Sequence, residues 1–304
     1  IEILHCTADS LSLDGVLLSD YNIGIIDGTP PHMIDPKVPG CIDEIVNLGQ
    51  CWNEDGLKQN KDQIILQQKL ISNYYKRAYS YLKAAKILRD DLRNIYVDAV
   101  DYSITNHKCD ELIKNVFDGV TRKGKTSSQR HMFASAITPE GSVNFLECLF
   151  EDLEKRFIIT GQLGTGKSIL IERVLDVALM KGLDVEVYHC AMNPEKVEHI
   201  IIKDLNIGFI TSIKPHEFIK LKERDFIINL DEALDTSKLV HYNEIVEYNT
   251  SVYWDLYKAA IHNLDQTKKV RFELEKLYYT NMNFNSTEVI RDELLSKMYK
   301  IINK

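Results

Sequence analysis

The residues with the clearest chemical signature lie at positions 161–168, where the sequence reads Gly-Gln-Leu-Gly-Thr-Gly-Lys-Ser. This spacing fits the pattern G-x-x-x-x-G-K-[ST], in which a glycine-rich loop wraps an anion so that successive backbone N–H groups point inward. A short apolar strand is predicted before the loop, over 157–160, and an amphipathic helix after it, over 169–179. The positive end of the helix dipole would then face the anion. The context predicts a phosphate-binding loop rather than a simple glycine turn.

The side chains of this loop predict which phosphate compound it holds. Lys167 is expected to reach the β- and γ-phosphates, and the hydroxyl of Ser168 is expected to ligate Mg²⁺. We therefore expect a nucleoside triphosphate, ATP, together with Mg²⁺. The residues expected to hold them are Gly161, Leu163, Gly164, Thr165, Gly166, Lys167, Ser168 and Ile169.

The same pattern occurs a second time, at 119–126, as Gly-Val-Thr-Arg-Lys-Gly-Lys-Thr. The preceding residues 111–117 read as a helix rather than a buried strand, and the polar residues 127–131 could not pack a helix onto a sheet. Without a strand and a helix nothing holds such a loop in shape, so this match, including Lys125, is predicted to be linker.

An internal repeat sets the domain organisation. Residues 1–32 align with 185–216 at a constant offset of 184, with ten identities where chance predicts about two. Further on, 44–48 aligns with 226–230. The identical positions of the first copy are Glu2, His5, Cys6, Asp20, Asn22, Ile23, Gly24, Ile26, Pro31 and His32. The chain is therefore predicted to be a duplicated α/β protein.

The predicted domains are a first repeat over 1–105, a polar linker over 106–135 and a second domain over 136–304. Each is expected to hold a parallel sheet flanked by helices, followed by a long helical segment. Relative to the second copy, the first begins after the point where strand, loop and helix should be, so it is expected to lack its N-terminal phosphate-loop unit.

Apolar stripes mark the two long helical segments. One runs from Ile71 through Ala78, Ala85 and Leu92 to Ile95, and a less regular one includes Val252, Leu256 and Ala259. Either stripe fits a core or helix-hairpin seam, which we favour, or a coiled-coil interface with a partner.

A magnesium site also needs a carboxylate at the end of a neighbouring strand. The strand predicted over 23–26 runs into Asp27, whereas its counterpart over 207–210 runs into Thr211. A rival strand over 226–230 runs into Asp231 and Glu232, although the first copy has neutral residues at the matching positions. Asp231 and Glu232 either serve the metal or a water, which would make them catalytic with Lys167, or cap the next helix.

Histidine and cysteine end equivalent strands in the two copies, as His5-Cys6 and His189-Cys190, and Pro31-His32 and Pro215-His216 follow the next strands. Ligands of parallel α/β sheets bind at the carboxyl ends of strands. These pairs are therefore expected either to line the nucleotide or acceptor pocket or to be buried structural residues.

Composition excludes several classes of protein. The 37 basic and 45 acidic residues give a net charge of −8 and a pI near 5.6, so neither nucleic acid nor an anionic membrane is an expected partner. No apolar run approaches the roughly 18 residues that span a bilayer. The six cysteines are scattered, with no Cys-x-x-Cys pair and no signal-peptide pattern, which favours a reducing, cytoplasmic location.

The order of these motifs resembles an uncharacterised bacterial family of tandem P-loop proteins. The resemblance rests on Tyr188-His-Cys190, on the 27–32 loop Asp-Gly-Thr-Pro-Pro-His, on the 133–141 stretch Phe-Ala-Ser-Ala-Ile-Thr-Pro-Glu-Gly and on the 161–168 loop. Members are usually described as ATPases or nucleotide-kinase-like, with a P-loop in each half. The chain departs from the pattern at 211–214, where Thr-Ser-Ile-Lys replaces the Asp-Gly-Thr-Pro of the first half.

Three functions are compatible with these observations. The leading hypothesis is a Mg²⁺-dependent ATPase. The second is a kinase that transfers the γ-phosphoryl group to a small-molecule acceptor, which ranks lower because the arginines of the second domain form no lid-like cluster. The third is a non-catalytic nucleotide sensor, favoured by the neutral Thr211. No oligomeric state is predicted.

Overall fold

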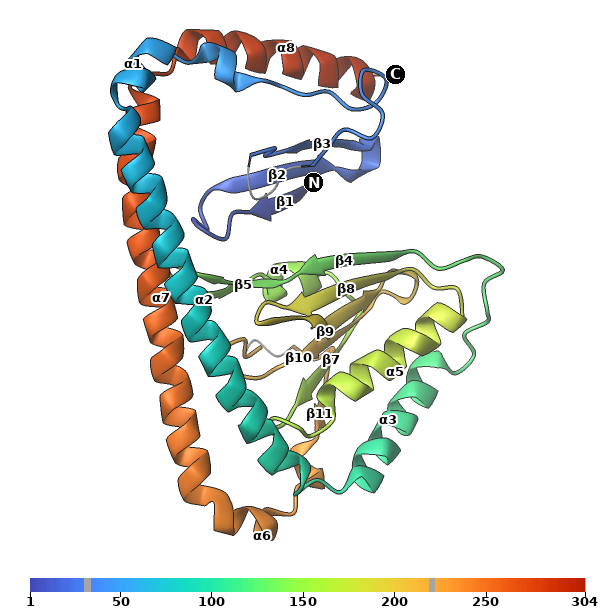
Figure 1. Ribbon diagram of the computed structural model, residues 1–304. Helices are drawn as coiled ribbons and strands as arrows, with labels where there is room; N and C mark the ends of the chain where they lie inside the picture. Colours follow the sequence, from blue (N-terminus) through green and yellow to red (C-terminus); the bar gives the residue numbers. More distant parts are fainter. Residues whose placement is uncertain (30–33, 219–221, 304) are drawn as a thin grey trace. The chain divides into compact units, whose positions relative to one another are not determined.

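The computed structural model of the chain describes residues 1–29, 34–218 and 222–303. It is an α/β structure with two compact units, one formed by 1–78 and 262–304 and the other by 79–261 (Figure 1). The units differ from the sequence repeats because the long helices α2 (Lys61–Val97) and α7 (Asn243–Tyr279) each contribute residues to both units.

A six-stranded sheet forms the centre of the larger unit. Its strands, in spatial order, are β11 (Asp225–Asn229), β7 (Lys155–Thr160), β10 (Ile207–Thr211), β9 (Asn193–Ile202), β8 (Val185–Cys190) and β4 (Gln129–Phe133). All adjacent pairs are parallel except those made by β9, which is antiparallel to β8 and β10. The prediction of a parallel sheet is therefore wrong for β9. The reason is local: only two residues separate β8 from β9, and so short a connection joins antiparallel strands.

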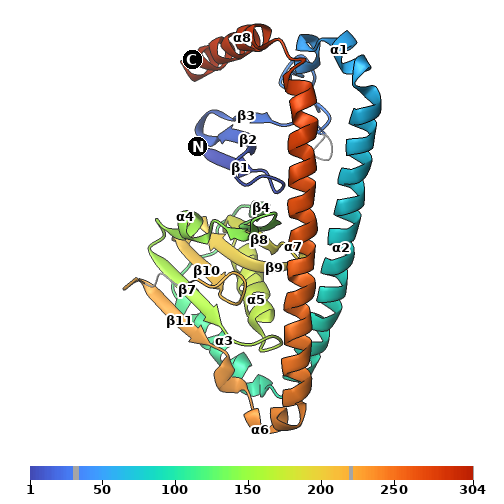
Figure 2. The ribbon, with the colours of Figure 1, turned by 90° about the vertical axis from the view of Figure 1, so that its left-hand side faces the viewer.

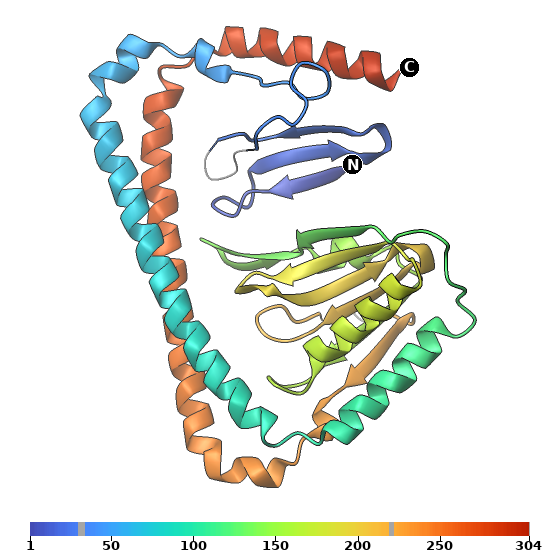
Figure 3. The same ribbon diagram turned by 45° about the vertical axis from the view of Figure 1, so that its right-hand side comes forward.

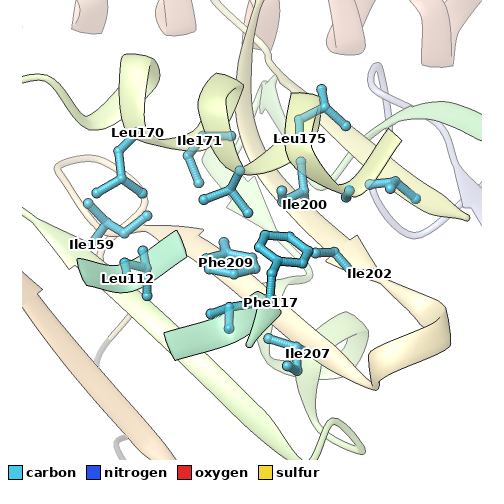
Figure 4. Packing of buried hydrophobic residues seen from close by; sticks show 14 of the residues in the cluster. Leu112, Phe117, Ile159, Leu170, Ile171, Leu175, Ile200, Ile202, Ile207 and Phe209 are labelled. Carbon is cyan, nitrogen blue, oxygen red and sulfur yellow. The ribbon is translucent and has the colours of Figure 1, made fainter. Parts of the chain in front are cut away.

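Two helices cover one face of this sheet, as Figure 3 shows for α5 (Lys167–Met180) and α3 (Tyr102–Phe117). Leu170, Ile171 and Leu175 of α5 and Leu112 and Phe117 of α3 converge on apolar side chains of the strands (Figure 4). The other face packs a second apolar cluster around Phe150 of α4 (Leu146–Phe150). The helix predicted after the 161–168 loop is confirmed, and its apolar periodicity is the reason that it buries one face.

The stretch predicted to be linker is shorter in the structure. Residues 106–117 belong to α3 and 129–133 to β4, which leaves 118–128. The second glycine-rich match lies in that connection and follows a helix, as expected. Lys123 and Lys125 form ion pairs there with Asp204 and Asp184.

The rest of the larger unit consists of short elements. A hairpin of β5 (Ser135–Thr138) and β6 (Gly141–Asn144) precedes α4, and a short helix α6 (Thr236–Leu239) precedes α7. Single 3₁₀ turns span Lys203–Leu205, Asp231–Ala233 and Val240–Tyr242.

The smaller unit repeats the backbone of β8, β9 and β10 in its own strands β1 (Glu2–His5), β2 (Leu13–Leu18) and β3 (Ile23–Ile26). The pairing Glu2↔Leu17 matches Glu186↔Ile201, and both hairpins contain a register shift near the same histidine position. Asn22 and Asn206 even share a left-handed conformation, with φ of 52° and 55°. The internal repeat is therefore present at the level of strand register.

Each copy also donates one equivalent backbone hydrogen bond to the other copy, and the two bonds are related by an offset of 182 residues. In the larger unit the Asp101 N–H donates to the Ala233 carbonyl at 2.8 Å, and in the smaller unit the Asn283 N–H donates to the Cys51 carbonyl at 2.9 Å. Each pair joins the turn after one long helix to the segment before the other. The remaining elements of the smaller unit are the 3₁₀ turns Ser19–Tyr21 and Leu48–Cys51 and the helices α1 (Glu54–Gln59) and α8 (Phe284–Ile302).

Residues 44–47 of the first copy are not a strand, although their counterparts form β11. In the larger unit β11 pairs with β7, and no counterpart of β7 is present among the described residues of the smaller unit. Without a neighbour to satisfy its backbone groups, an extended segment does not form a ladder.

The stripes of the long helices face the interior of each unit. Ala78, Ala85 and Leu92 of α2 are buried as predicted. On α7 the buried stripe is shifted by one residue from the predicted stripe and includes Tyr253 and Tyr257. Large aromatic rings therefore fill the seam that aliphatic residues were expected to fill. Within the larger unit, the two helices run side by side (Figures 1 and 2), and Asn249 Nδ2 donates to Asp91 Oδ2 at 2.7 Å. None of the helices, over their described residues, combines the length and apolar character that a membrane span requires.

Candidate functional site

The 161–168 loop connects the end of β7 to the start of α5, as the sequence predicts. Gly161, Gly164 and Gly166 have φ values of 140°, 81° and 99°, which side chains rarely adopt. The glycines are therefore needed for the path of the chain, and this path directs the loop toward the N-terminus of α5.

Lys167 is the first residue of α5, and its side chain folds back over the loop. Its Nζ donates to the carbonyl oxygens of Gly161 and Gln162, and only 5% of the residue is exposed. Burial lowers the pKa of Lys167 to about 7; the charge of Lys196 also lowers it, Asp231 raises it, and Arg89 lowers it further. An anion bound at the loop would oppose these effects and restore the positive charge.

The other loop residues differ in how far their side chains are buried. Thr165 is buried, and its hydroxyl donates to the Gln162 carbonyl at 2.9 Å. Ser168 is half-buried in the first turn of α5, as is Leu163 in the loop, whereas the Ile169 side chain is exposed. The last two residues can therefore contribute backbone N–H groups and not a polar side chain.

The helices α2 and α3, which precede the predicted second domain in sequence, pack against the 161–168 loop. Tyr102 of α3 donates from its hydroxyl to the Gly164 carbonyl at 3.3 Å, and Thr105 donates to the Thr165 carbonyl at 3.4 Å. A Cβ added to Gly164 would lie 2.8 Å from a carbonyl oxygen of α2, and one on Gly166 would lie 2.6 Å from Thr105 Cγ2. The sequence analysis missed these contacts because they join segments about 60 residues apart.

Asp231 and Glu232, which the sequence alone does not distinguish, lie in different surroundings. Asp231 follows β11, the parallel neighbour of β7, and its Oδ1 accepts the backbone N–H of Gln162 at 2.7 Å. Glu232 points away and forms an exposed ion pair with Lys108 at 2.8 Å. Asp231 does not cap the next helix, since Asp235 is the N-cap of α6. Asp231 is thus the acid beside the loop.

Thr211 has a structural role at the end of β10. The residue is 2% exposed; its hydroxyl donates to the Glu198 carbonyl at 2.7 Å, and its N–H donates to His199 Nδ1 at 3.1 Å. Burial, the largest cause, lowers the pKa of His199 to about 4, so this ring is neutral and can accept that hydrogen bond. Thr211 therefore ties the end of β10 to the middle of β9 rather than occupying the place of a metal-binding acid.

A small cavity lies at the carboxyl ends of β8 and β10. Its volume is about 10 Å³, room for about one water molecule. Its polar lining consists of Arg89, Cys190, Glu198, Lys214, His216, Tyr253 and Tyr257. Cys190, Pro215 and His216 thus line a cavity as the sequence suggested, but one too small for an acceptor. His189 instead contacts His131, with ring nitrogens 2.8 Å apart, and Pro31 and His32 lie outside the described residues.

The surroundings of Lys167 include charged residues that the sequence analysis did not single out. Arg89 on α2, Lys196 and Glu198 on β9 all act electrostatically on the Lys167 ammonium, and Asp231 raises the pKa of Tyr96 on α2, although burial is the larger cause. Comparison of the two long helices at an offset of 182 draws attention to Arg89 and Tyr96, because Arg89 aligns with Arg271 and Tyr96 with Tyr278.

The site offers one carboxylate and one hydroxyl to a metal. In the described part of the chain, no three His, Cys, Asp or Glu side chains converge on one point. This donor set fits Mg²⁺, which keeps several waters and binds through one or two protein oxygens together with substrate phosphates. Comparison with protein-family models, curated proteins and solved structures finds no match to this chain.

Proposed function

We propose that the larger unit is a P-loop nucleotide-binding domain that binds Mg-ATP at the 161–168 loop and hydrolyses it. The observation that carries the proposal is the contact between two neighbouring parallel strands: the loop after β7 is held at Gln162 by Asp231, the acid after β11. A phosphate-binding loop and a magnesium-ordering acid on adjacent strand ends are what the hydrolysis of a nucleoside triphosphate requires.

The residues of the chain would divide the work as follows. The backbone N–H groups of 163–169 and the N-terminus of α5 bind the phosphates, and Lys167 turns from the loop carbonyls toward the β- and γ-phosphates. Ser168 supplies a hydroxyl to the metal, and Asp231 orders its water shell. The bound metal supplies charge neutralisation of the phosphoryl group during transfer.

Hydrolysis is favoured over transfer to an acceptor by the size of the cavity at the carboxyl ends of β8 and β10. The cavity lined by Glu198 and Arg89 has room for about one water molecule and not for a small-molecule acceptor. We also propose that the chain is a tandem repeat of P-loop domains and that it is located in the cytoplasm. These proposals are supported by the repeat of strand register and by the six cysteines, all of them free thiols.

The test is calorimetric titration of Mg-ATP into the chain and into Lys167→Ala, together with phosphate release. Loss of a charge-assisted contact of about 1.5–3 kcal/mol should weaken binding by about 10- to 100-fold. Phosphate release without an added acceptor supports hydrolysis, and release only with an acceptor supports a kinase. Binding without turnover supports a sensor. Equal ATP affinity of a folded Lys167→Ala protein and the parent would show that the site is elsewhere.

A further inference from the structure

The two long helices preserve a set of residues that the strand repeat does not include. Aligned at an offset of 182, α2 and α7 share eight of 37 positions, where about two are expected by chance. Six of the eight occupy two positions of a seven-residue repeat, so they form one stripe on each helix, and the other two are Lys76 and Lys86. The six positions on α2 are Tyr75, Ala78, Leu82, Arg89, Leu92 and Tyr96.

Arg89 is the only charged member of this stripe, and it is placed similarly in both copies. Arg89 lines the cavity with Tyr257 and Cys190. Its counterpart Arg271 lies in hydrogen-bonding contact with Tyr75 and close to Cys6, which are the counterparts of Tyr257 and Cys190. Each arginine thus meets a tyrosine of the opposite long helix and a cysteine at a strand end.

Arg89 lies one turn before Arg93 on α2, and the Arg93 carbonyl oxygen would be 2.8 Å from a Cβ added to Gly164 of the 161–168 loop. Tyr96, which lies seven residues later on the same stripe and about 10 Å along the helix, is close enough to Asp231 for that carboxylate to raise its pKa, burial being the larger cause. Glu198 shares the cavity with Arg89.

The charges at this corner of the site are unbalanced. Arg89 contacts the Tyr253 ring at 5.9 Å and Met192 Sδ at 3.8 Å, and over the described ranges neither Arg89 nor Lys196 forms an ion pair with a carboxylate. Glu198 is 2% exposed, and its Oε2 makes no hydrogen bond to any described residue. Lys167, Arg89 and Lys196 thus outnumber the buried Glu198 carboxylate, whose Oε2 lies 3.7 Å from Nε2 of the neutral His199.

We propose that Arg89 binds the γ-phosphate of the nucleotide held by the 161–168 loop, and that the water-sized cavity beside it, with Glu198 in its wall, is where the attacking water lies. The proposal rests on the proposed function. A guanidinium presents two parallel N–H donors to phosphate oxygens, and here it is supplied by a helix that begins in the first copy. The γ-phosphate is the distinguishing group, since the β-phosphate is already served by Lys167 and the loop.

The experiment compares Mg-ADP with the Mg²⁺ complex of the non-hydrolysable imido analogue of ATP. Arg89→Met keeps much of the apolar stem and removes the charge. It should weaken binding of the analogue by about 10- to 100-fold and leave ADP binding unchanged. Arg89→Lys should lie between the two. Arg77→Met is the matched control: it removes an exposed guanidinium about three turns earlier on α2, at a position where the other copy has Ala259, and should behave as the parent.

The outcomes distinguish this inference from the proposed function. If the parent binds neither nucleotide, the proposed function fails and Arg89 has no γ-phosphate to bind. If the parent binds both and Arg89→Met changes neither affinity, or both equally, only the inference about Arg89 is overturned. If thermal melting shows that Arg89→Met does not fold, Arg89→Lys is measured in its place. A weaker affinity of Arg89→Lys for the analogue, with unchanged affinity for ADP, supports the inference. The same ratio of the two affinities as in the parent overturns it.

Discussion

The pKa of Lys167 makes nucleotide binding depend on pH in a direction that can be worked out. In the ligand-free chain, burial and the neighbouring Lys196 and Arg89 hold this pKa at about 7, against the opposing effect of Asp231. Phosphates around the ammonium would return the pKa to about 10 or above. Between these two values the bound form holds one more proton than the free form, so affinity falls as pH rises.

The size of the effect depends on the charged fraction of Lys167. With a pKa of about 7, this fraction is about one half at pH 7 and about 0.01 at pH 9, so the affinity should fall by about 50-fold over this range. At pH 8 binding should take up about 0.9 protons. The nucleotide contributes little there, since the second ionisation of a phosphate lies near 6.

The assay is calorimetry at pH 8 in two buffers that differ in ionisation enthalpy, because the difference between the observed heats gives the number of protons taken up. Lys167→Met is the control, since it keeps the length of the side chain and has nothing to titrate; its weaker binding should show no uptake. Equal uptake by the parent and Lys167→Met, or an affinity that rises with pH, would refute the account of this lysine.

Five further variants test the surroundings of the site. Asp231→Asn should lower turnover by about 10- to 100-fold, whereas Glu232→Gln should leave it unchanged; the opposite ranking would reverse the assignment of the two acids. Lys125→Ala, in the second glycine-rich match, should leave ATP affinity as it is in the parent, and a loss would mean that this loop also binds phosphate. Gly164→Ala should cost about 1–3 kcal/mol in urea unfolding, because φ is 81° and α2 leaves no room for a Cβ; a neutral result would mean that the loop relaxes at no cost. Thr211→Asp should cost at least about 1–3 kcal/mol by placing an acceptor against the Glu198 carbonyl, and a stable, faster enzyme would show that position 211 does belong to the metal site.

The local features of this protein could be predicted from its amino-acid sequence. The spacing of glycines, lysine and serine at 161–168, with an apolar strand before and an apolar-periodic helix after, is enough to predict the loop and α5, because both depend on neighbouring residues. The repeat predicted that β1, β2 and β3 would correspond to β8, β9 and β10, and the rejection of the 119–126 match followed from the helix that precedes it.

Which distant residues surround that loop depends on how the strands and helices pack. Asp231 and Glu232 are adjacent in sequence, and it is the parallel pairing of β11 with β7 that places one on Gln162 and the other in an exposed ion pair. The first copy could not settle this, because its segment 44–47 has no neighbouring strand and does not form the element that positions Asp231. The role of Arg89 could not be predicted for a related reason. What a charged residue on an apolar helical stripe does depends on which residues of the opposite helix and of the strand ends lie next to it. Contacts between residues far apart in sequence depend on the packing of whole elements, which local pattern does not encode.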